Sequence, residues 1–133
     1  MTGTAVGDDV LLDLPALPEY GRIARLAAAN LALRYGFSYR EVEDIQLAID
    51  ESFILLLGHG PRLGQIRLRF HPDKGTITIG ASAELTDDLA DPDTGSHHRF
   101  GMLVTDLVDE HRVSESGREL ELVKRHRAVG HSS

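Results

Sequence analysis

The sequence contains no cysteine among its 133 residues. A disulfide framework, a thiolate zinc site and a cysteine nucleophile are therefore all excluded, and the composition suits a reducing compartment. No apolar run approaches the roughly 20 residues that a helix needs to cross a bilayer. The first residues, MTGTAVGDD, lack the basic start and the apolar stretch of a signal peptide. These absences predict a cytoplasmic protein that has no contact with a membrane.

Net positive charge is missing as well. The chain carries 14 Lys and Arg against 21 Asp and Glu, which gives a formal net charge of −7. An acidic domain repels a phosphate backbone, so direct binding of nucleic acid is not expected. Hydrophobic residues make up 41% of the chain and charged residues 26%, which is ordinary usage for a globular protein. The length suits one domain.

The spacing of apolar residues predicts one strand and two helices in the first part of the chain. Positions 10–14 (VLLDL) favour a short strand. Apolar residues then recur at helical spacing from 19 to 35. Ser38, followed three residues later by Glu41, predicts a capping box. A second helix is therefore expected over 39–57.

Beyond the second helix the apolar period changes from helical to two. It predicts a hairpin of strands 66–70 and 77–83, whose side chains alternate between core and solvent. The acidic segment 85–98 has no apolar period and is predicted to be a mobile loop. A third helix over roughly 100–110 and a last hairpin within 113–122 follow. This order predicts a mixed sheet with helices on one face, a two-layer α/β sandwich of the α+β class.

Several short stretches occur in an order that is typical of a known family. They are LPALP at 14–18 leading into IAR at 23–25, AIDES at 48–52 with HG at 59–60, and the closing stretches 103–110 and 120–125. Together they resemble the anti-sigma serine kinases of the GHKL ATPase superfamily. The resemblance implies a GHKL (Bergerat-type) fold over 10–125, between a flexible N-terminus at 1–9 and a polar tail at 126–133.

Members of this family bind a sigma factor and keep it from polymerase, and many also phosphorylate a STAS-domain antagonist with ATP. The resemblance therefore implies two partners, an alternative (stress or development) sigma factor and a STAS-domain anti-anti-sigma factor. It also implies a homodimer whose sheets or first helices meet, for which the edge strand 10–14 is a candidate surface. Arg25 matches the family's arginine that contacts both partners, and a guanidinium can anchor an acidic partner bidentately. A solvated helix charge is the alternative role for Arg25.

The family's magnesium motif is incomplete in this sequence. In the N-box, Glu-x-x-x-Asn, the glutamate acts as general base and the asparagine holds Mg²⁺. Glu51 is present, but Leu55 stands at the asparagine position and has no lone pair for the ion. Glu51 is therefore expected to contact a partner or to serve the structure, with a catalytic base as the alternative. Asp50 beside it does not make a carboxylate pair, because neighbouring helical residues diverge by about 100°.

The adenine and phosphate motifs are altered too. By register the motif Asp-x-Gly-x-Gly falls on 83–87, where Ala83 replaces the aspartate that recognises adenine, and Glu84 should point to the opposite face of its strand. The glycine-rich phosphate loop falls on 98–101, where Phe100 would obstruct the amide cradle. The sequence thus predicts an anti-sigma pseudokinase that uses neither ATP nor Mg²⁺. The alternative is an active ATP-dependent serine kinase.

A metal site suggests itself at two neighbouring histidines, His97 and His98, which are close in sequence to Asp91 and Asp93. Two histidines without a third ligand at regular spacing make a weak site. A solvated loop is the preferred interpretation, and no metal is predicted.

Overall fold

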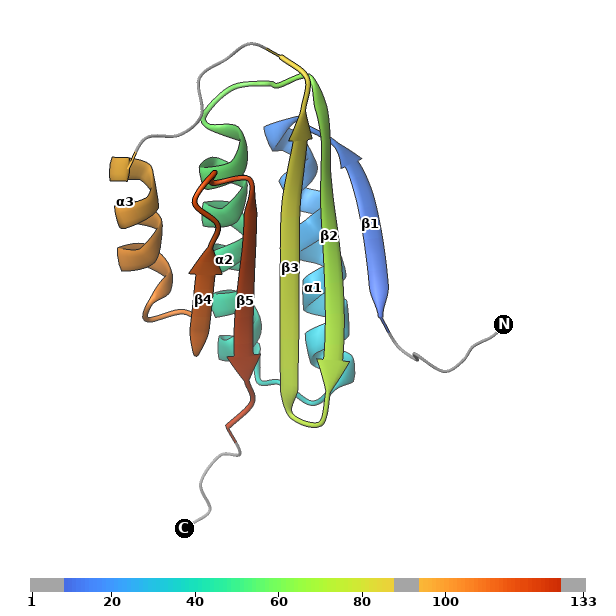
Figure 1. Ribbon diagram of the computed structural model, residues 1–133. Helices are drawn as coiled ribbons and strands as arrows, with labels where there is room; N and C mark the ends of the chain where they lie inside the picture. Colours follow the sequence, from blue (N-terminus) through green and yellow to red (C-terminus); the bar gives the residue numbers. More distant parts are fainter. Residues whose placement is uncertain (1–8, 88–93, 128–133) are drawn as a thin grey trace.

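A five-stranded sheet with helices on one face makes up the described part of the chain, which is residues 9–87 and 94–127 of a computed structural model (Figure 1). The elements are, in order, β1 (Val10–Pro15), the single-turn helix η1 (Pro18–Tyr20), α1 (Gly21–Arg34), α2 (Tyr39–Leu57), β2 (Gly64–Asp73), β3 (Thr76–Leu85), α3 (Thr94–Val104), β4 (Glu110–Val113) and β5 (Glu119–Arg125). The N-terminus predicted to be flexible lies outside the described residues except for Asp9, and so does the predicted tail beyond Arg127.

The sheet has the strand order β1-β2-β3-β5-β4, and each of its neighbouring pairs is antiparallel. The predicted α+β class and the two layers are confirmed, but the predicted mixed sheet is wrong. Two helices connect β1 to β2, so the chain reverses direction three times, from β1 to α1, from α1 to α2 and from α2 to β2, and β2 returns antiparallel to β1. One helix connects β3 to β4, and these two strands do run parallel, but β5 lies between them.

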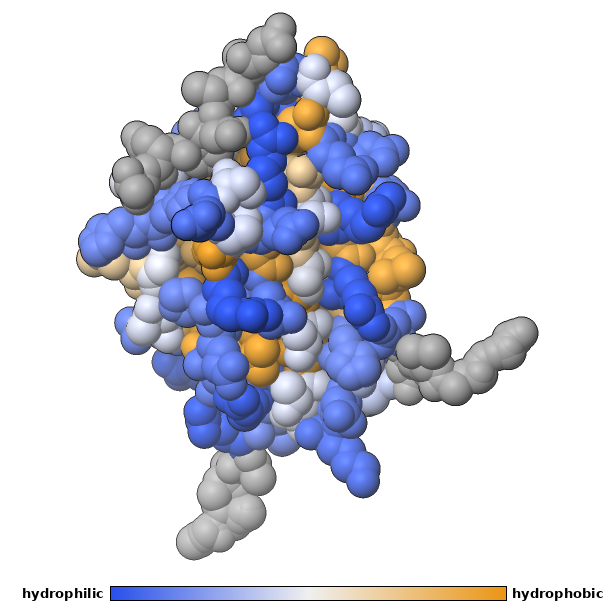
Figure 2. Space-filling view, viewed as in Figure 1, coloured by the Kyte–Doolittle hydropathy of each residue, from blue (hydrophilic) through white to orange (hydrophobic). Residues whose placement is uncertain are grey.

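Side chains that alternate along the strands separate the core from the open face of the sheet. On β2 the inward side chains of Ile66, Leu68 and Phe70 are at most 1% exposed, whereas Arg67 and Arg69 between them are exposed. Figure 2 looks onto the face of the sheet that helices leave uncovered, where hydrophilic side chains predominate. The core therefore lies between the sheet and the helices.

Helix α1 presents small residues to the core. Ala24, Ala28 and Ala32 are at most 2% exposed, whereas Ile23 and Leu26, two of the apolar positions that recur at helical spacing, are 41% and 56% exposed. The helix forms within the range that the spacing predicted, but these two apolar positions do not belong to its buried face. Alanines let the helix backbone lie close to its neighbours, and the larger side chains are turned to solvent.

The third helix begins earlier than predicted. It covers Thr94–Val104, not 100–110, and takes up the second half of the segment predicted to be a loop. Its only fully buried apolar side chains, among the residues whose burial is described, are Phe100 and Val104. The first turns are polar, so no helical period is visible there in the sequence. Among residues 9–87 and 94–127, no helix is long and apolar enough for a bilayer crossing.

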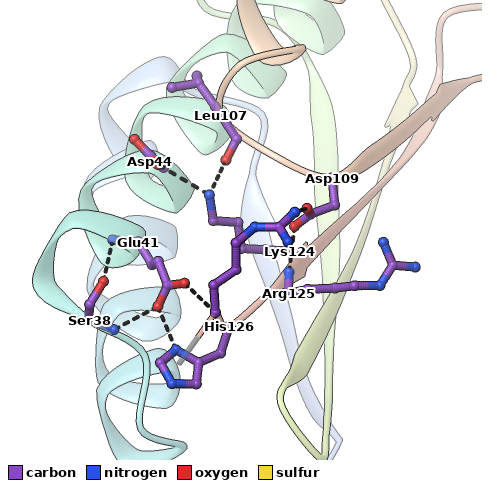
Figure 3. Close-up of polar contacts among 9 residues, drawn as sticks. Ser38, Glu41, Asp44, Leu107, Asp109, Lys124, Arg125 and His126 are labelled. Carbon is purple, nitrogen blue, oxygen red and sulfur yellow. Dashed lines mark hydrogen bonds and ion pairs between the residues drawn. The ribbon is translucent and has the colours of Figure 1, made fainter. Parts of the chain in front are cut away.

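The capping box of α2 forms as predicted and also binds the end of β5 (Figure 3). The amide of Ser38 donates to Oε1 of Glu41 over 2.8 Å, and the amide of Glu41 donates to Oγ of Ser38 over 3.1 Å. Nδ1 of His126 lies 2.7 Å from the same Oε1, and the amide of Arg127 donates to Oε2 over 2.8 Å. Nζ of Lys124 adds a contact of 3.1 Å to Asp44 one turn further along α2.

The hydrogen bonds around Glu41 change its pKa. Partial burial acts to raise the pKa, but the bonds from the Ser38 amide, from His126 and from the Arg127 amide outweigh it and lower the pKa from 4.5 to about 2. The folded state therefore holds the ionised carboxylate more strongly than the unfolded chain does.

We expect Glu41 to contribute to the fall in the free energy of unfolding at acidic pH. Because its pKa is lowered on folding, its contribution is fully present above about pH 4.5 and is lost as the pH falls toward 2. Glu41→Gln should lower the free energy of unfolding at pH 7 and flatten its fall between pH 4.5 and 2, as measured by urea unfolding. Glu43→Gln, on the exposed side of the same turn, should change neither. An equally steep acid limb in Glu41→Gln would contradict this expectation.

Candidate functional site

A cleft of about 270 Å³ lies between the second half of α2, the turn that follows it, and α3. Its lining consists of Glu51, Ile54, Leu55, Gly58, His59, Arg62, Ser96, Arg99 and Phe100. The structure thus brings together three of the positions that the sequence singled out for nucleotide chemistry, which are Glu51, Leu55 and Phe100. Ala83 is not part of this lining.

Glu51 and Leu55 share one face of α2, four residues apart, because the helix has 3.6 residues per turn. The side chain of Glu51 is 22% exposed, and its Oε1 lies 3.8 Å from Nη1 of Arg99 on α3. Leu55 is 2% exposed and belongs to the apolar core. An aliphatic side chain therefore stands one turn from the carboxylate, where the family's motif places an oxygen ligand for Mg²⁺.

The predicted phosphate loop is wrong in its position. Residues 98–101 lie inside α3 and form no loop before a helix. Phe100 is 2% exposed and lines the cleft from within that helix. The segment 88–93, which precedes α3, lies outside the described residues.

The two strand residues considered for adenine recognition lie on opposite faces of β3. Ala83 is 6% exposed and faces the core, whereas Glu84 is exposed on the open face. This is the alternation that the strand period requires. A methyl group therefore stands on the face where the family's motif uses a carboxylate, and Glu84 cannot replace it from the other side.

Arg62, which lines the cleft, belongs to a buried ion pair that the sequence did not reveal. Nε and Nη2 of Arg62 each donate to the carboxylate of Asp87 over 2.8 Å, and the amide of Leu63 donates to Oδ2 of Asp87 over 3.0 Å. The side chains of Arg62 and Asp87 are 5% and 9% exposed. Asp87 stands at the second glycine of the expected adenine motif, and its carboxylate is engaged in this internal contact.

Arg25 is paired as well, at a different place on the surface. Its Nη1 lies 2.5 Å from Oδ1 of Asp50, and the two side chains are 33% and 39% exposed. The contact joins α1 to α2 and is not part of the cleft lining. Asp50 and Glu51 diverge as predicted, since Asp50 turns to α1 and Glu51 to α3.

The histidines considered for a metal site are helical. His97 and His98 lie in α3, and Asp91 and Asp93 fall outside the described residues. Within residues 9–87 and 94–127, no group of three or more acidic or histidine side chains is placed to hold a metal ion. Nε2 of His97 is buried against Gly117, where the Cβ of any larger residue would lie 2.6 Å from it. This histidine packs the β4–β5 turn against α3.

No protein-family model matches the chain. Curated proteins named Serine-protein kinase RsbW are similar to it. The one from Listeria innocua serovar 6a is 37% identical over 78 residues, which cover 56% of this chain and 50% of the relative. The one from Oceanobacillus iheyensis is 32% identical over 97 residues, or 68% and 61% of the two chains. The one from Bacillus subtilis strain 168 is 33% identical over 66 residues, or 47% and 41%. The aligned part spans about half the length of these relatives.

Proposed function

We propose that this chain, whose matches to the RsbW serine-protein kinases confirm its predicted resemblance to the anti-sigma kinase family, is an anti-sigma factor without kinase activity. It binds and sequesters an alternative sigma factor of the stress or development class in the cytoplasm, and a STAS-domain anti-anti-sigma factor releases it. The observation that carries this proposal is Leu55, a buried aliphatic side chain in the cleft wall at the position of the magnesium ligand.

Two further features of the cleft support the proposal. Ala83 offers no carboxylate to an adenine amino group on the core face of β3. Asp87 occupies a glycine position and is held by Arg62 and by the amide of Leu63, so this backbone is not open to close approach by a ligand. Metal and adenine contacts are therefore both missing from the places where the family has them.

An active serine kinase is the second candidate function. Glu51 favours it, because its carboxylate is partly exposed in the cleft, where a general base would act on a serine hydroxyl. The curated relatives are named as kinases. The two candidates differ in whether the chain binds Mg-ATP.

We expect Mg-ATP at millimolar concentration to leave the melting temperature unchanged. A ligand at 100 times its dissociation constant adds about 2.7 kcal/mol to the free energy of unfolding, which a thermal-shift scan detects as several degrees. A relative named as a serine-protein kinase, scanned in parallel, serves as the positive control. A magnesium-dependent shift, or transfer of the γ-phosphate to a STAS-domain protein, would establish the kinase instead.

A chain without ATP chemistry must release the sigma factor by another route, and we propose plain competition. The sigma factor and the dephosphorylated STAS-domain protein share overlapping surface around Arg25 on α1, and another enzyme sets the phosphorylation of the STAS-domain protein. The proposed assembly is a homodimer, and β1 supports it as an edge strand that pairs only with β2 in the described sheet.

Arg25→Glu should weaken binding of the sigma factor at least tenfold, because a carboxylate replaces the guanidinium at the proposed anchor. The melting temperature should change little, since a partly exposed ion pair contributes little to folding. Titration calorimetry would use the sigma factor that co-purifies with the tagged wild-type chain. Arg22→Glu, an exposed arginine on the same helix, is the matched control, and Glu51→Ala should also bind almost as wild type does. Wild-type binding by Arg25→Glu would refute the anchor.

A further inference from the structure

The two arginine–aspartate pairs that involve α2 or its following turn differ in geometry. Arg62 donates hydrogen bonds from two nitrogens to the carboxylate of Asp87, and both side chains are less than 10% exposed. Arg25 contacts Asp50 through Nη1, and about a third of each side chain is exposed. A bidentate buried pair is held firmly, whereas a single exposed contact exchanges readily with another acceptor. Arg25 is therefore placed to change partners.

The surroundings of the exposed pair indicate the kind of partner. Leu47 is 52% exposed and lies on the same face of α2 as Asp50, three residues before it, and Leu26, the residue after Arg25 on α1, is 56% exposed. The side-chain amide of Gln46 lies 3.5 Å from the carbonyl oxygen of Arg25, which brings this part of α2 beside α1. A surface that combines an arginine with exposed leucines on two neighbouring helices has the composition of a protein–protein interface. The complementary surface is an apolar segment that carries one carboxylate.

We propose that Asp50 is an intramolecular competitor for that carboxylate. It neutralises Arg25 in the unbound protein, and a partner's carboxylate must replace it to reach the guanidinium. Asp50 thus sets the affinity of this surface and selects partners whose apolar contacts are large enough to drive the exchange. The inference rests on the proposed function, because it assigns Asp50 a role at the partner surface around Arg25.

The matched pair of variants is Asp50→Asn and Glu43→Gln. Both remove one negative charge from the exposed side of α2, but only Asp50 contacts Arg25. Titration with the sigma factor that co-purifies with the tagged wild-type chain should show three- to fivefold tighter binding by Asp50→Asn, and a change of less than 1.5-fold for Glu43→Gln. In an Arg25→Gln background, Asp50→Asn should again change binding by less than 1.5-fold, because the guanidinium for which the two carboxylates compete is gone.

Weaker or unchanged binding by Asp50→Asn would overturn the inference, as would equal tightening by Glu43→Gln or tightening that persists without Arg25. Those results leave the proposed function standing if the wild-type chain binds the sigma factor. Failure of the wild-type chain to bind any sigma factor overturns both. Near-identical melting temperatures of the variants would show that the comparison is made between folded proteins.

Discussion

Arg62→Ala is expected to lower the free energy of unfolding by about 3–5 kcal/mol, because it leaves the carboxylate of Asp87 buried without its cation. The side chain of Asp87 is 9% exposed, and the backbone amide of Leu63 also donates a hydrogen bond to its carboxylate. Urea unfolding followed by circular dichroism at pH 7 measures the loss. Arg67→Ala removes an exposed partner of Asp13 and should cost little.

A double variant tests whether Arg62→Ala loses stability because the buried carboxylate of Asp87 no longer has the guanidinium of Arg62 beside it. Arg62→Met with Asp87→Leu replaces both charges by apolar side chains of similar size, which is often close to neutral for a buried pair. It should recover much of the stability that Arg62→Ala loses. If the double variant is as unstable as the single one, the loss comes from packing or from the backbone contact of Leu63.

Gly64→Ala should cost about 3 kcal/mol or more. Gly64 has a φ of +132°, which side chains rarely adopt, and a Cβ there would lie 2.0 Å from the carbonyl oxygen of Glu84. The obstacle is backbone of the paired strand β3, where Gly64 is opposite Leu85, so neither strand can move aside without breaking the register. The melting temperature and the urea midpoint measure the loss.

Gly80→Ala is the control for this substitution, since nothing lies within 4 Å of a Cβ at Gly80 on the open face of β3. Its stability should stay close to that of the wild type or rise slightly, because alanine has less backbone freedom to lose on folding. If Gly64→Ala and Gly80→Ala lose the same amount of stability, the loss comes from replacing any glycine in a strand. The short distance between a Cβ at Gly64 and the carbonyl oxygen of Glu84 would then not be its cause.

Local patterns predicted the elements that depend on local interactions. The capping box at Ser38 and Glu41 marked the start of α2, and the alternation of Ile66, Leu68 and Phe70 marked β2. The start of α3 was missed because its first turns are polar and pack against the β4–β5 turn through His97. The strand directions were missed because the position of β5 between β3 and β4 is a property of the whole sheet.

The candidate site was predictable only in part, for the same reason. Helical spacing was enough to place Glu51 and Leu55 on one face of α2. Arg62 and Asp87, like Arg25 and Asp50, are 25 positions apart and belong to no short motif. Such contacts arise when the fold brings distant segments together, so a single sequence carries no signal for them.

The antiparallel pairing of β1 with β2 has a consequence for the timing of synthesis. Asp13 and Arg67 face each other in the finished sheet but are 54 positions apart. At about 5–20 residues per second, β1 waits roughly 3–10 seconds on the ribosome before its partner strand is made. During that wait Asp9 and Asp13, which later pair with Arg69 and Arg67, place negative charge on both sides of an apolar segment. Charges that flank an apolar strand disfavour its pairing with another chain, so we expect these two aspartates to lower the risk of aggregation in this interval.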